Sequence, residues 1–450
     1  MDRWFAVGTV RVVRPIVFAS CLLLASCQQP AHDPAPAGGG GGGGAGVTPF
    51  AMGTPDVVLL VTGQTKGVLE PCYCAGEMFG GFARRATLVR RYRRAFPHTM
   101  LIDTGDAFAM GAPGDPRNHF VVRGYQQIGY DALVLGYTEW MTPGLDQLVA
   151  QRGVTYLSTN VATAGASKVV KRRWGGVKLA VLSELDRDSR VLQEGRMRGL
   201  KMAPAGALAK RVAALERDGY AVALVVNGND GAVRRAARHG ADLVVQGRFT
   251  AKKATLRAIG DARAARTGGY DYVSAFALRI RAGKITDVEH RYERVDKRWP
   301  NDSKLLDTYY AYSKTALKHA QQTKRSDGLA YVASAACAKC HKEQYEGWKA
   351  FRHAHAYQTL FDVERASDPD CLRCHTTGLT STRGFYSMEK TPGLANVNCQ
   401  DCHAVELAAH SVTPTAPAVT EATCTRCHTS TTDPKFDYKT RRAHVGCCAK

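Results

Sequence analysis

The chain has 450 residues, of which 45% are hydrophobic and 22% charged, the balance of a globular protein with room for two or three domains. Its 61 Lys and Arg against 40 Asp and Glu give a formal net charge of +21. No patch of basic residues interleaved with aromatic ones stands out, so we do not expect a nucleic-acid-binding protein.

The first residues have the pattern of an export signal. Three arginines precede a short apolar stretch, residues 16–24, which is too short for a comfortable transmembrane helix. The following "LASC" resembles the bacterial lipoprotein cleavage box, with Cys27 as the lipidated residue; a plain signal peptide with an incidental Cys27 is the alternative. Residues 28–54 form a Pro/Ala/Gly tether. We expect residues 1–27 to be a lipoprotein signal peptide that anchors the protein at the periplasmic face of a bacterial membrane, the outer membrane above all.

Residues 55–297 alternate between buried runs and amphipathic helical patterns. Strands are predicted at "DVVLLVT", "TMLIDTGD", "DALVLG", "VTYLST", "AVALVVN" and "ADLVVQG". Helices are predicted at "FARRATLVRRYRRAF", "PGLDQLVAQRG" and "ALAKRVAALERDG". Hairpin-like pairs at 167–184 and 270–295 interrupt the alternation. The pattern is typical of an α/β (α+β) domain with some antiparallel strands.

This segment resembles the UshA-like 5'-nucleotidases, a family of calcineurin-like metallophosphoesterases. The stretches that carry the resemblance are "LEPCYCAGEMFGGFARRATL", "LIDTGDAF" and "GYDALVLGYTE". The resemblance implies a sandwich of two sheets flanked by helices, and an activity that needs two metal ions held by Asp and His at strand ends.

The family's metal ligands are mostly replaced in this chain. Of seven expected ligands, one carboxylate, Asp106, matches. The other six ligand positions carry different residues: Gln64, Lys66, Tyr137, Asn227 or Gly228, Arg248 and Thr250. Thr138 stands where the family has its catalytic His. Lys66 and Arg248 would put positive charge where cations should sit. We therefore expect a degenerate domain without a dinuclear metal centre; the alternative is an active metallophosphatase or 5'-nucleotidase with rearranged ligands.

A Cys-x-Cys pair, Cys72 and Cys74, follows the first predicted strand and resembles a subgroup of UshA-like proteins with cysteines at this position. In an oxidising compartment the pair suits a strained, easily reduced disulfide, and the nearby Lys66, Arg84 and Arg85 would lower a thiol pKa. Three interpretations stay open: a redox-active pair that exchanges electrons with the second domain, a soft-ligand site for a metal or sulfur species, and a structural disulfide or inert thiols.

The C-terminal part contains four copies of C-x-x-C-H, the signature of covalent c-type haem attachment. Two thiols bind the haem vinyl groups, and the adjacent histidine is the proximal iron ligand. The copies comprise Cys337, Cys340 and His341; Cys371, Cys374 and His375; Cys399, Cys402 and His403; and Cys424, Cys427 and His428. We expect four c-type haems in a tetrahaem domain at 331–450, preceded by a linking helix within 298–330.

The sixth iron ligands decide between electron carriage and catalysis. Four further histidines, His353, His355, His410 and His444, are candidates. The stretches "YVASAACAKCHKEQYEGWKAFRHAHAYQTL", "DPDCLRCHTTGL" and "NVNCQDCHAVELAAH" resemble the cytochrome c-554 group of multihaem cytochromes. This resemblance implies closely packed haems in a mainly helical domain, with His353, His410 and His444 at distal positions and His355 less secure.

The sequence therefore predicts a membrane-anchored periplasmic electron carrier. Its N-terminal domain would dock a partner or hold the redox-active cysteine pair. The basic excess, partly offset by haem propionates, favours an acidic redox partner in the periplasm or membrane. A multihaem reductase of a small nitrogen or sulfur oxyanion, acting at one open haem, is a further alternative.

Overall fold

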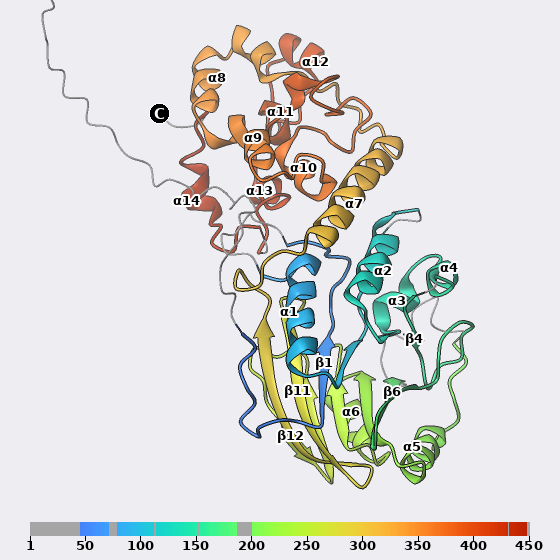
Figure 1. Ribbon diagram of the computed structural model, residues 1–450. Coiled ribbons are helices and arrows are strands. Elements are labelled where there is room, and N and C mark those ends of the chain that lie inside the picture. The colour runs from blue at the N-terminus through green and yellow to red at the C-terminus, as the bar shows by residue number, and fades with distance from the viewer. Residues whose placement is uncertain are drawn as a thin grey trace, which may run out of the picture. The chain divides into compact units, whose positions relative to one another are not determined.

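A computed structural model of the protein describes residues 46–71, 79–111, 114–151, 153–186, 200–430 and 432–447 (Figure 1). Three residues singled out from the sequence, Cys27, Cys72 and Cys74, lie outside these ranges. Two sheets flanked by helices occupy the described residues up to Arg294, and short helices predominate beyond Tyr331. The predicted two-sheet sandwich followed by a mainly helical region is confirmed.

The first sheet has the strand order β12-β11-β1-β2-β3-β4. The neighbours β1, β2, β3 and β4 are parallel, whereas β11 and β12 pair in antiparallel fashion at the other edge. The strands are β1 (Val57–Thr62), β2 (Thr99–Asp103), β3 (Ala132–Val134), β4 (Tyr156–Leu157), β11 (Tyr272–Arg281) and β12 (Lys284–Arg294). The parallel register sets Thr62 beside Asp103, so the loops after β1 and β2 leave the sheet together.

The second sheet has the order β5-β6-β7-β8-β10-β9, with a parallel centre and an antiparallel strand at each edge. Its strands are β5 (Val170–Trp174), β6 (Val177–Leu185), β7 (Ala221–Asn227), β8 (Leu243–Gln246), β9 (Arg257–Ile259) and β10 (Ala262–Arg266). The predicted hairpins at 167–184 and 270–295 correspond to β5–β6 and β11–β12.

Alternation along the strands builds three apolar layers. In β1, Val57, Leu59 and Val61 face the second sheet, whereas Val58 and Leu60 face the helices on the outer side of the first sheet. A third layer lies between the second sheet and its own helices. All six residues of β1 are buried, as expected for a central strand covered on both faces.

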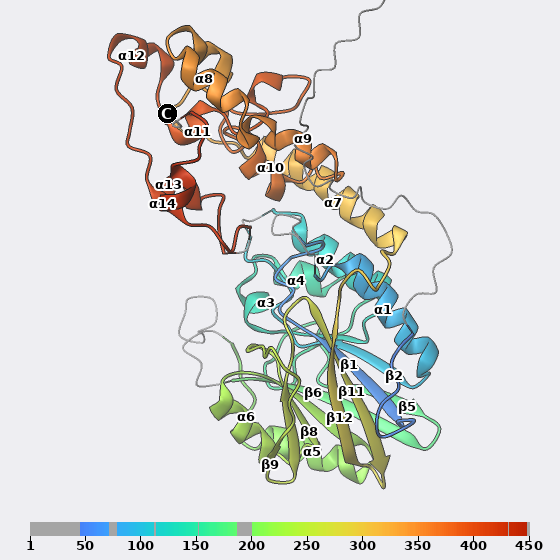
Figure 2. The same cartoon turned by 90° about the vertical axis from the view of Figure 1, so that its left-hand side faces the viewer.

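Helices cover both outer faces of the sandwich (Figures 1 and 2). The first sheet is covered by α1 (Phe82–Ala95), α2 (Arg117–Ile128) and α7 (Ser303–Gln322), and the second by α5 (Ala207–Arg217) and α6 (Asp230–Ala237). The short α3 (Tyr137–Met141) and α4 (Leu145–Val149) follow β3.

The predicted linking helix is α7, and it belongs to the core of the N-terminal domain. Asp302 caps its first turn by accepting a hydrogen bond from the backbone N–H of Leu305. Buried side chains of α7, among them Tyr309 and Tyr312, pack in the same apolar layer as α1 and α2. The helix also contacts α10 (Pro369–His375) of the C-terminal region, which connects the two parts.

The C-terminal region consists of short helices joined by loops: η3 (Ser334–Lys339), α8 (Lys342–Lys349), η4 (Arg352–His355), α9 (Ala356–Phe361), α10 (Pro369–His375), η5 (Pro392–Leu394), α11 (Cys399–Cys402), α12 (Leu407–Val412), α13 (Glu421–Thr425) and α14 (Tyr438–Arg442). Its apolar cluster is small, with Leu360, Leu372 and Phe385 among six buried members. The Cys and His side chains of the four motifs are half-buried, except for Cys340 and His341, which are exposed.

Candidate functional site

The loops after β1 and β2 form a bonded pair at the carboxyl edge of the first sheet, where α/β proteins commonly place their sites. The backbone N–H of Gln64 donates to the Gly105 carbonyl at 3.1 Å, and that of Lys66 donates to the Asp106 carbonyl at 3.0 Å. Gln64, Lys66 and Asp106 all have left-handed backbones, with φ of 61°, 48° and 57°. Such conformations cost side-chain-bearing residues about 1 kcal/mol or more, and they cluster at site loops.

Asp106, the residue that matches a metal ligand, has both carboxylate oxygens engaged by the chain. The Gln64 side-chain amide donates to Asp106 Oδ2 at 2.9 Å and to the Arg248 carbonyl at 2.8 Å. The backbone N–H of Thr138 donates to Asp106 Oδ1 at 3.0 Å. The structure thus brings together Gln64, Asp106, Thr138 and Arg248, which the sequence assigns to separate motifs of one metal centre.

The remaining motif positions have other contacts. The Arg248 guanidinium lies 4.5 Å from the centre of the Tyr137 ring, a cation–π contact. Asn227 donates to the Thr104 carbonyl at 2.9 Å, and its own buried Oδ1 has no hydrogen-bond partner. Thr250 is exposed. Within the described ranges, no three His, Cys, Asp or Glu side chains are grouped so that they could hold a metal ion.

A buried glutamate, Glu139, fixes the loop that carries Asp106. Its carboxylate accepts hydrogen bonds at 2.7–2.9 Å from the backbone N–H groups of Asp106, Ala107, Phe108 and Gly136. Burial, followed by the neighbouring Asp106 carboxylate, raises the pKa of Glu139, and the N–H donors act in the opposite sense. The backbone shape of this loop is therefore held by the Glu139 side chain, which also accepts a hydrogen bond from the Thr138 hydroxyl at 3.3 Å.

Arg85 lies beneath these loops and is 1% exposed. Its guanidinium donates to Thr65 Oγ1 at 3.3 Å, to the Tyr130 hydroxyl at 3.2 Å and to the Tyr270 carbonyl at 3.1 Å. The buried Asp103 nearby accepts hydrogen bonds from Thr62 and Tyr125, and burial raises its pKa. Arg85 is thus a buried, hydrogen-bonded group beneath the loop. Its effect on Cys72 and Cys74, which lie outside the described residues, stays a prediction.

The cysteines of the four C-terminal motifs form a row. Cys337 of the first motif contacts Cys399 of the third, and Cys427 of the fourth contacts Cys374 of the second. Cys402 of the third motif is close enough to Cys424 of the fourth to affect its charge. The spatial order is therefore first, third, fourth and second, an order that the sequence alone does not contain.

Proximal and candidate distal histidines face one another in two pairs. The ring centres of His341 and His410 are 5.8 Å apart, and those of His353 and His428 are 6.2 Å apart. Burial, followed by the neighbouring imidazoles, lowers the pKa of His353 and of His403. The shift favours the neutral imidazole, the form that binds metals.

Four histidines of the C-terminal region have Nδ1 close to an oxygen atom, which leaves Nε2 available. The Nδ1 atoms of His375, His410 and His444 lie 2.7–2.9 Å from the carbonyls of Ala356, Thr415 and Thr440, respectively, and Nδ1 of His428 lies 3.0 Å from Asp433. Such second contacts fix the tautomer and orientation of metal-binding imidazoles. His355 is the opposite case, because its Nε2 lies 3.0 Å from the Lys349 carbonyl.

The second motif is held by residues that the sequence analysis did not single out. Asp368 caps α10 ahead of Pro369, and its carboxylate accepts a hydrogen bond from Tyr309 of α7. Asp370 forms an ion pair with Arg117 of α2 at 2.7 Å. The Asp-Pro dipeptide does signal a helix start, but its distant partners leave no local signal.

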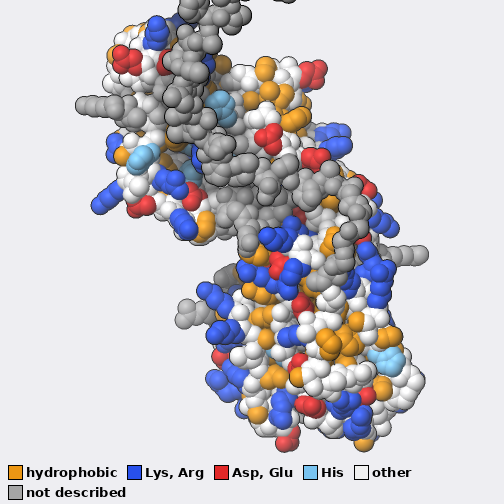
Figure 3. Space-filling view, turned by 60° about the vertical axis from the view of Figure 1, so that its left-hand side comes forward, with side chains coloured by type: hydrophobic (Ala, Val, Ile, Leu, Met, Phe, Trp, Pro, Cys, Tyr) orange, Lys and Arg blue, Asp and Glu red, His pale blue; other side chains and the backbone are white. Residues whose placement is uncertain are grey.

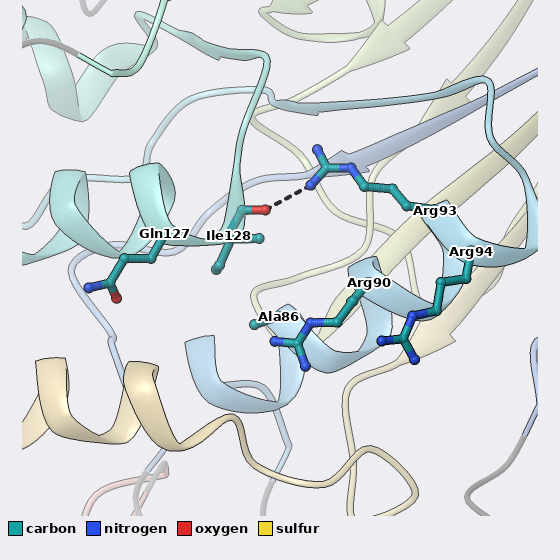
Figure 4. A pocket seen from close by; sticks show the side chains of 6 residues that line it. All are labelled: Ala86, Arg90, Arg93, Arg94, Gln127 and Ile128. Atoms are coloured by element: carbon teal, nitrogen blue, oxygen red, sulfur yellow. Dashed lines mark hydrogen bonds between the residues drawn. The ribbon is translucent and has the colours of Figure 1, made fainter.

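A basic hollow lies between α1 and α2, lined by Ala86, Arg90, Arg93, Arg94, Gln127 and Ile128 (Figure 4). Arg93 donates to the Ile128 carbonyl at 2.9 Å, and Arg90 pairs with Asp302. Since two of the three guanidinium groups already have partners, the hollow is a weak candidate for an anion site.

Among the helices that the structure describes, none is both long and apolar enough to span a membrane.

Comparison with known proteins covers both parts. The family model of cytochrome c554 and c-prime matches residues 336–404. Cytochrome c-554 of Nitrosomonas europaea is 30% identical over 82 residues, 15% of this chain and 35% of that protein. The 5'-nucleotidase of Bos taurus is 34% identical over 116 residues, 24% of this chain and 20% of that protein. The chain thus spans about a third of the first relative and a fifth of the second.

A solved structure supports the fold of the N-terminal part. The Thermus thermophilus sulfate thiohydrolase SoxB, in complex with glycerol, aligns with a TM-score of 0.51 over 64% of each chain at 16% identity. At this identity the likeness establishes the fold alone.

Proposed function

Since a domain with the 5'-nucleotidase and calcineurin-like fold is joined here to a cytochrome c554-like region, we propose that the protein carries electrons through four c-type haems. The observation that carries this proposal is the pairing of His341 with His410 and of His353 with His428. Bonds from a metal to imidazole are about 2 Å long, so two imidazoles on opposite sides of one iron have ring centres roughly 6 Å apart. Both pairs have this separation.

The donor groups fit covalently bound haem. Each motif offers two thiols and a proximal imidazole, and the second contacts at Nδ1 leave Nε2 free in His375, His410, His428 and His444. The bound haems would supply one-electron redox chemistry. The chain's own part is to hold the four motifs in a row, so that each site has a neighbour within the region.

The number of available distal histidines favours a second, alternative function. His410 pairs with His341, His353 pairs with His428, and His444 is free to serve one further iron. His355 has its Nε2 at the Lys349 carbonyl and does not present it to an iron. The four candidates thus supply three distal ligands for four irons. One haem with an open position would suit a reductase of a small nitrogen or sulfur oxyanion.

The N-terminal domain is proposed to be degenerate as a phosphoesterase, because the residues at its strand ends do not fit two metal ions. Asp106 is the single matching carboxylate, and both its oxygens accept hydrogen bonds from Gln64 and the Thr138 backbone. The cations Lys66 and Arg248 stand at two of the expected ligand positions. We assign this domain the role of docking a partner or presenting the Cys72–Cys74 pair, which would follow the loop that contains Lys66.

The location is proposed from the sequence. Lipidation at Cys27 would hold the protein at the periplasmic face of a membrane, with residues 28–54 as the tether. Basic side chains are distributed over the face seen in Figure 3 among acidic and hydrophobic ones. Together with the net charge of +21, this surface favours an acidic redox partner.

The test is to determine the haem content and the two activities on the purified full-length protein. Intact mass and the pyridine haemochrome absorbance should give four haems per chain, all reduced by dithionite and reoxidised reversibly. Phosphate release from nucleotides should stay at background with added Mn²⁺ or Zn²⁺. Fewer than four haems, or metal-dependent phosphate release, would overturn the corresponding half of the proposal.

A further inference from the structure

The helix that bears the second haem motif is fastened to the N-terminal domain at its first turn. Asp368 and Asp370 flank Pro369 there, just before Cys371. Arg117 Nη2 donates a hydrogen bond to Asp370 Oδ1 at 2.9 Å, and Arg117 Nη1 lies 2.7 Å from Asp370 Oδ2 in an ion pair. The Tyr309 hydroxyl donates to Asp368. Both donors come from helices, α2 and α7, whose other side chains form the core of the N-terminal domain.

This contact is partly shielded from water. The Arg117 side chain is 19% exposed and the Asp370 side chain 42% exposed, and the Arg117 guanidinium lies 5.3 Å from the centre of the buried Tyr312 ring. Asp368 and Tyr309 are 6% and 3% exposed. A bidentate guanidinium–carboxylate pair in such a place fixes geometry more strongly than a solvent-exposed ion pair does.

The same arginine reaches the strand-end loop. Its Cδ would lie 2.6 Å from a Cβ placed on Gly67, so the aliphatic stem of Arg117 packs directly against the backbone of this residue. Gly67 belongs to the loop after β1 and has a φ of +78°. One side chain therefore contacts the loop at its stem and the second haem motif at its guanidinium.

We propose that Arg117 is a positioning residue for the second haem, through which the N-terminal domain sets the orientation and the reduction potential of that site. The inference rests on the proposed function, and it gives the N-terminal domain a role that needs no metal. The second motif has the fourth as a neighbour, through the contact of Cys374 with Cys427.

The expected direction follows from charge. Reduction adds one electron to the site, so a nearby cation stabilises the ferrous state, and nearby carboxylates stabilise the ferric state. In a partly buried setting these effects are screened less than at the surface. Arg117 offsets the charge of Asp370, whereas Arg365 acts on Asp368. Removal of Arg117 therefore leaves the Asp370 carboxylate without its cation beside the haem.

Potentiometric titration of the full-length holoprotein, followed in the haem absorbance, tests the proposal. Arg117→Gln should lower the ferrous-to-ferric ratio of one of the four components about tenfold at fixed potential, which is 59 mV for one electron. Asp370→Asn should shift the same component in the opposite direction. The double variant should return to within about threefold of the unaltered protein, since both charges of the pair are then absent.

Arg123→Gln is the matched control, since Arg123 is an exposed arginine on the same helix. The proposal is overturned if Arg117→Gln shifts no component by more than twofold, if it shifts all four equally, or if both single variants shift in one direction, as a merely loosened structure would. If Arg117→Gln does not fold, Asp370→Asn alone decides by the direction of its shift. Absence of four reversible components in the unaltered protein would instead refute the proposed function.

Discussion

The side chain of His290 should make the N-terminal domain lose stability in mild acid. His290 of β12 is directly paired with Phe276 of β11, and the two rings stack with centres 4.1 Å apart. Neither ring nitrogen has a hydrogen-bond partner of good geometry. Burial lowers the pKa of His290 from 6.5 to about 4, and a smaller effect from the Thr255 backbone opposes it.

The magnitude follows from this difference. Between pH 6.5 and about 4 the unfolded chain binds a proton that the folded domain does not, so the free energy of unfolding falls as the pH falls. The contribution of neutral His290 to the free energy of unfolding is complete above pH 6.5 and is lost progressively as the pH falls towards 4. A shift of 2.5 units corresponds to about 3.4 kcal/mol in full, of which about 2 kcal/mol is lost by about pH 5.

Urea unfolding followed by far-ultraviolet circular dichroism measures this effect when the unaltered protein is compared with His290→Phe. Phenylalanine keeps an aromatic ring against Phe276 and cannot titrate. From about pH 7.5 to pH 5, the unaltered protein should lose about 2 kcal/mol more than the variant does. The other histidines titrate equally in both proteins and cancel. The reasoning is wrong if the two proteins lose the same stability within about 0.5 kcal/mol.

Two further predictions concern the two sites. Glu139→Gln should lower the free energy of unfolding by about 2–4 kcal/mol in the same urea assay, because a single amide oxygen cannot satisfy four buried N–H donors; a loss under 0.5 kcal/mol would contradict the role given to this carboxylate. His410→Ala should convert one haem from low to high spin in an electron paramagnetic resonance spectrum. The matched variant His355→Ala should leave the spectrum unchanged. Equal effects of the two substitutions would refute the assignment of His410 as a distal ligand.

The layers of the N-terminal domain could be predicted from the sequence because each rests on a local pattern. The runs that became β1, β2, β7 and β8 are long and apolar. Two elements are shorter than predicted: "VTYLST" contains the two-residue β4, and "PGLDQLVAQRG" contains the five-residue α4. Helix α2 has Gly124 in its interior, because a Cβ at this position would lie 2.2 Å from the Phe82 ring. Glycine is a poor helix former, so the sequence of α2 gives a weak helical signal.

The strand-end site was predictable in position, since the carboxyl ends of parallel strands meet at one edge. The contacts of Asp106 with Gln64 and Thr138 follow from that rule. The role of Arg85 did not follow, because it is one of six arginines in α1 and nothing local marks it as the buried one. The fastening of Asp370 by Arg117 spans 253 residues and depends wholly on tertiary structure.

In the C-terminal region, the spacing of each motif predicts covalent haem attachment, but it does not predict which two histidines lie together. His353 and His355 look alike in sequence, yet one ring faces His428 and the other turns Nε2 to a carbonyl. The order of motifs in the row likewise arises from how short helices pack, and a linear pattern does not encode it.

The most direct test of the haem ligation is an electron paramagnetic resonance spectrum of the oxidised full-length protein with quantified spins. We expect three low-spin haems with two imidazole ligands each, and a fourth haem to which none of the four candidate histidines is a distal ligand. Four high-spin signals, or low-spin signals that persist unchanged when His353 and His410 are both replaced by alanine, would contradict this ligation.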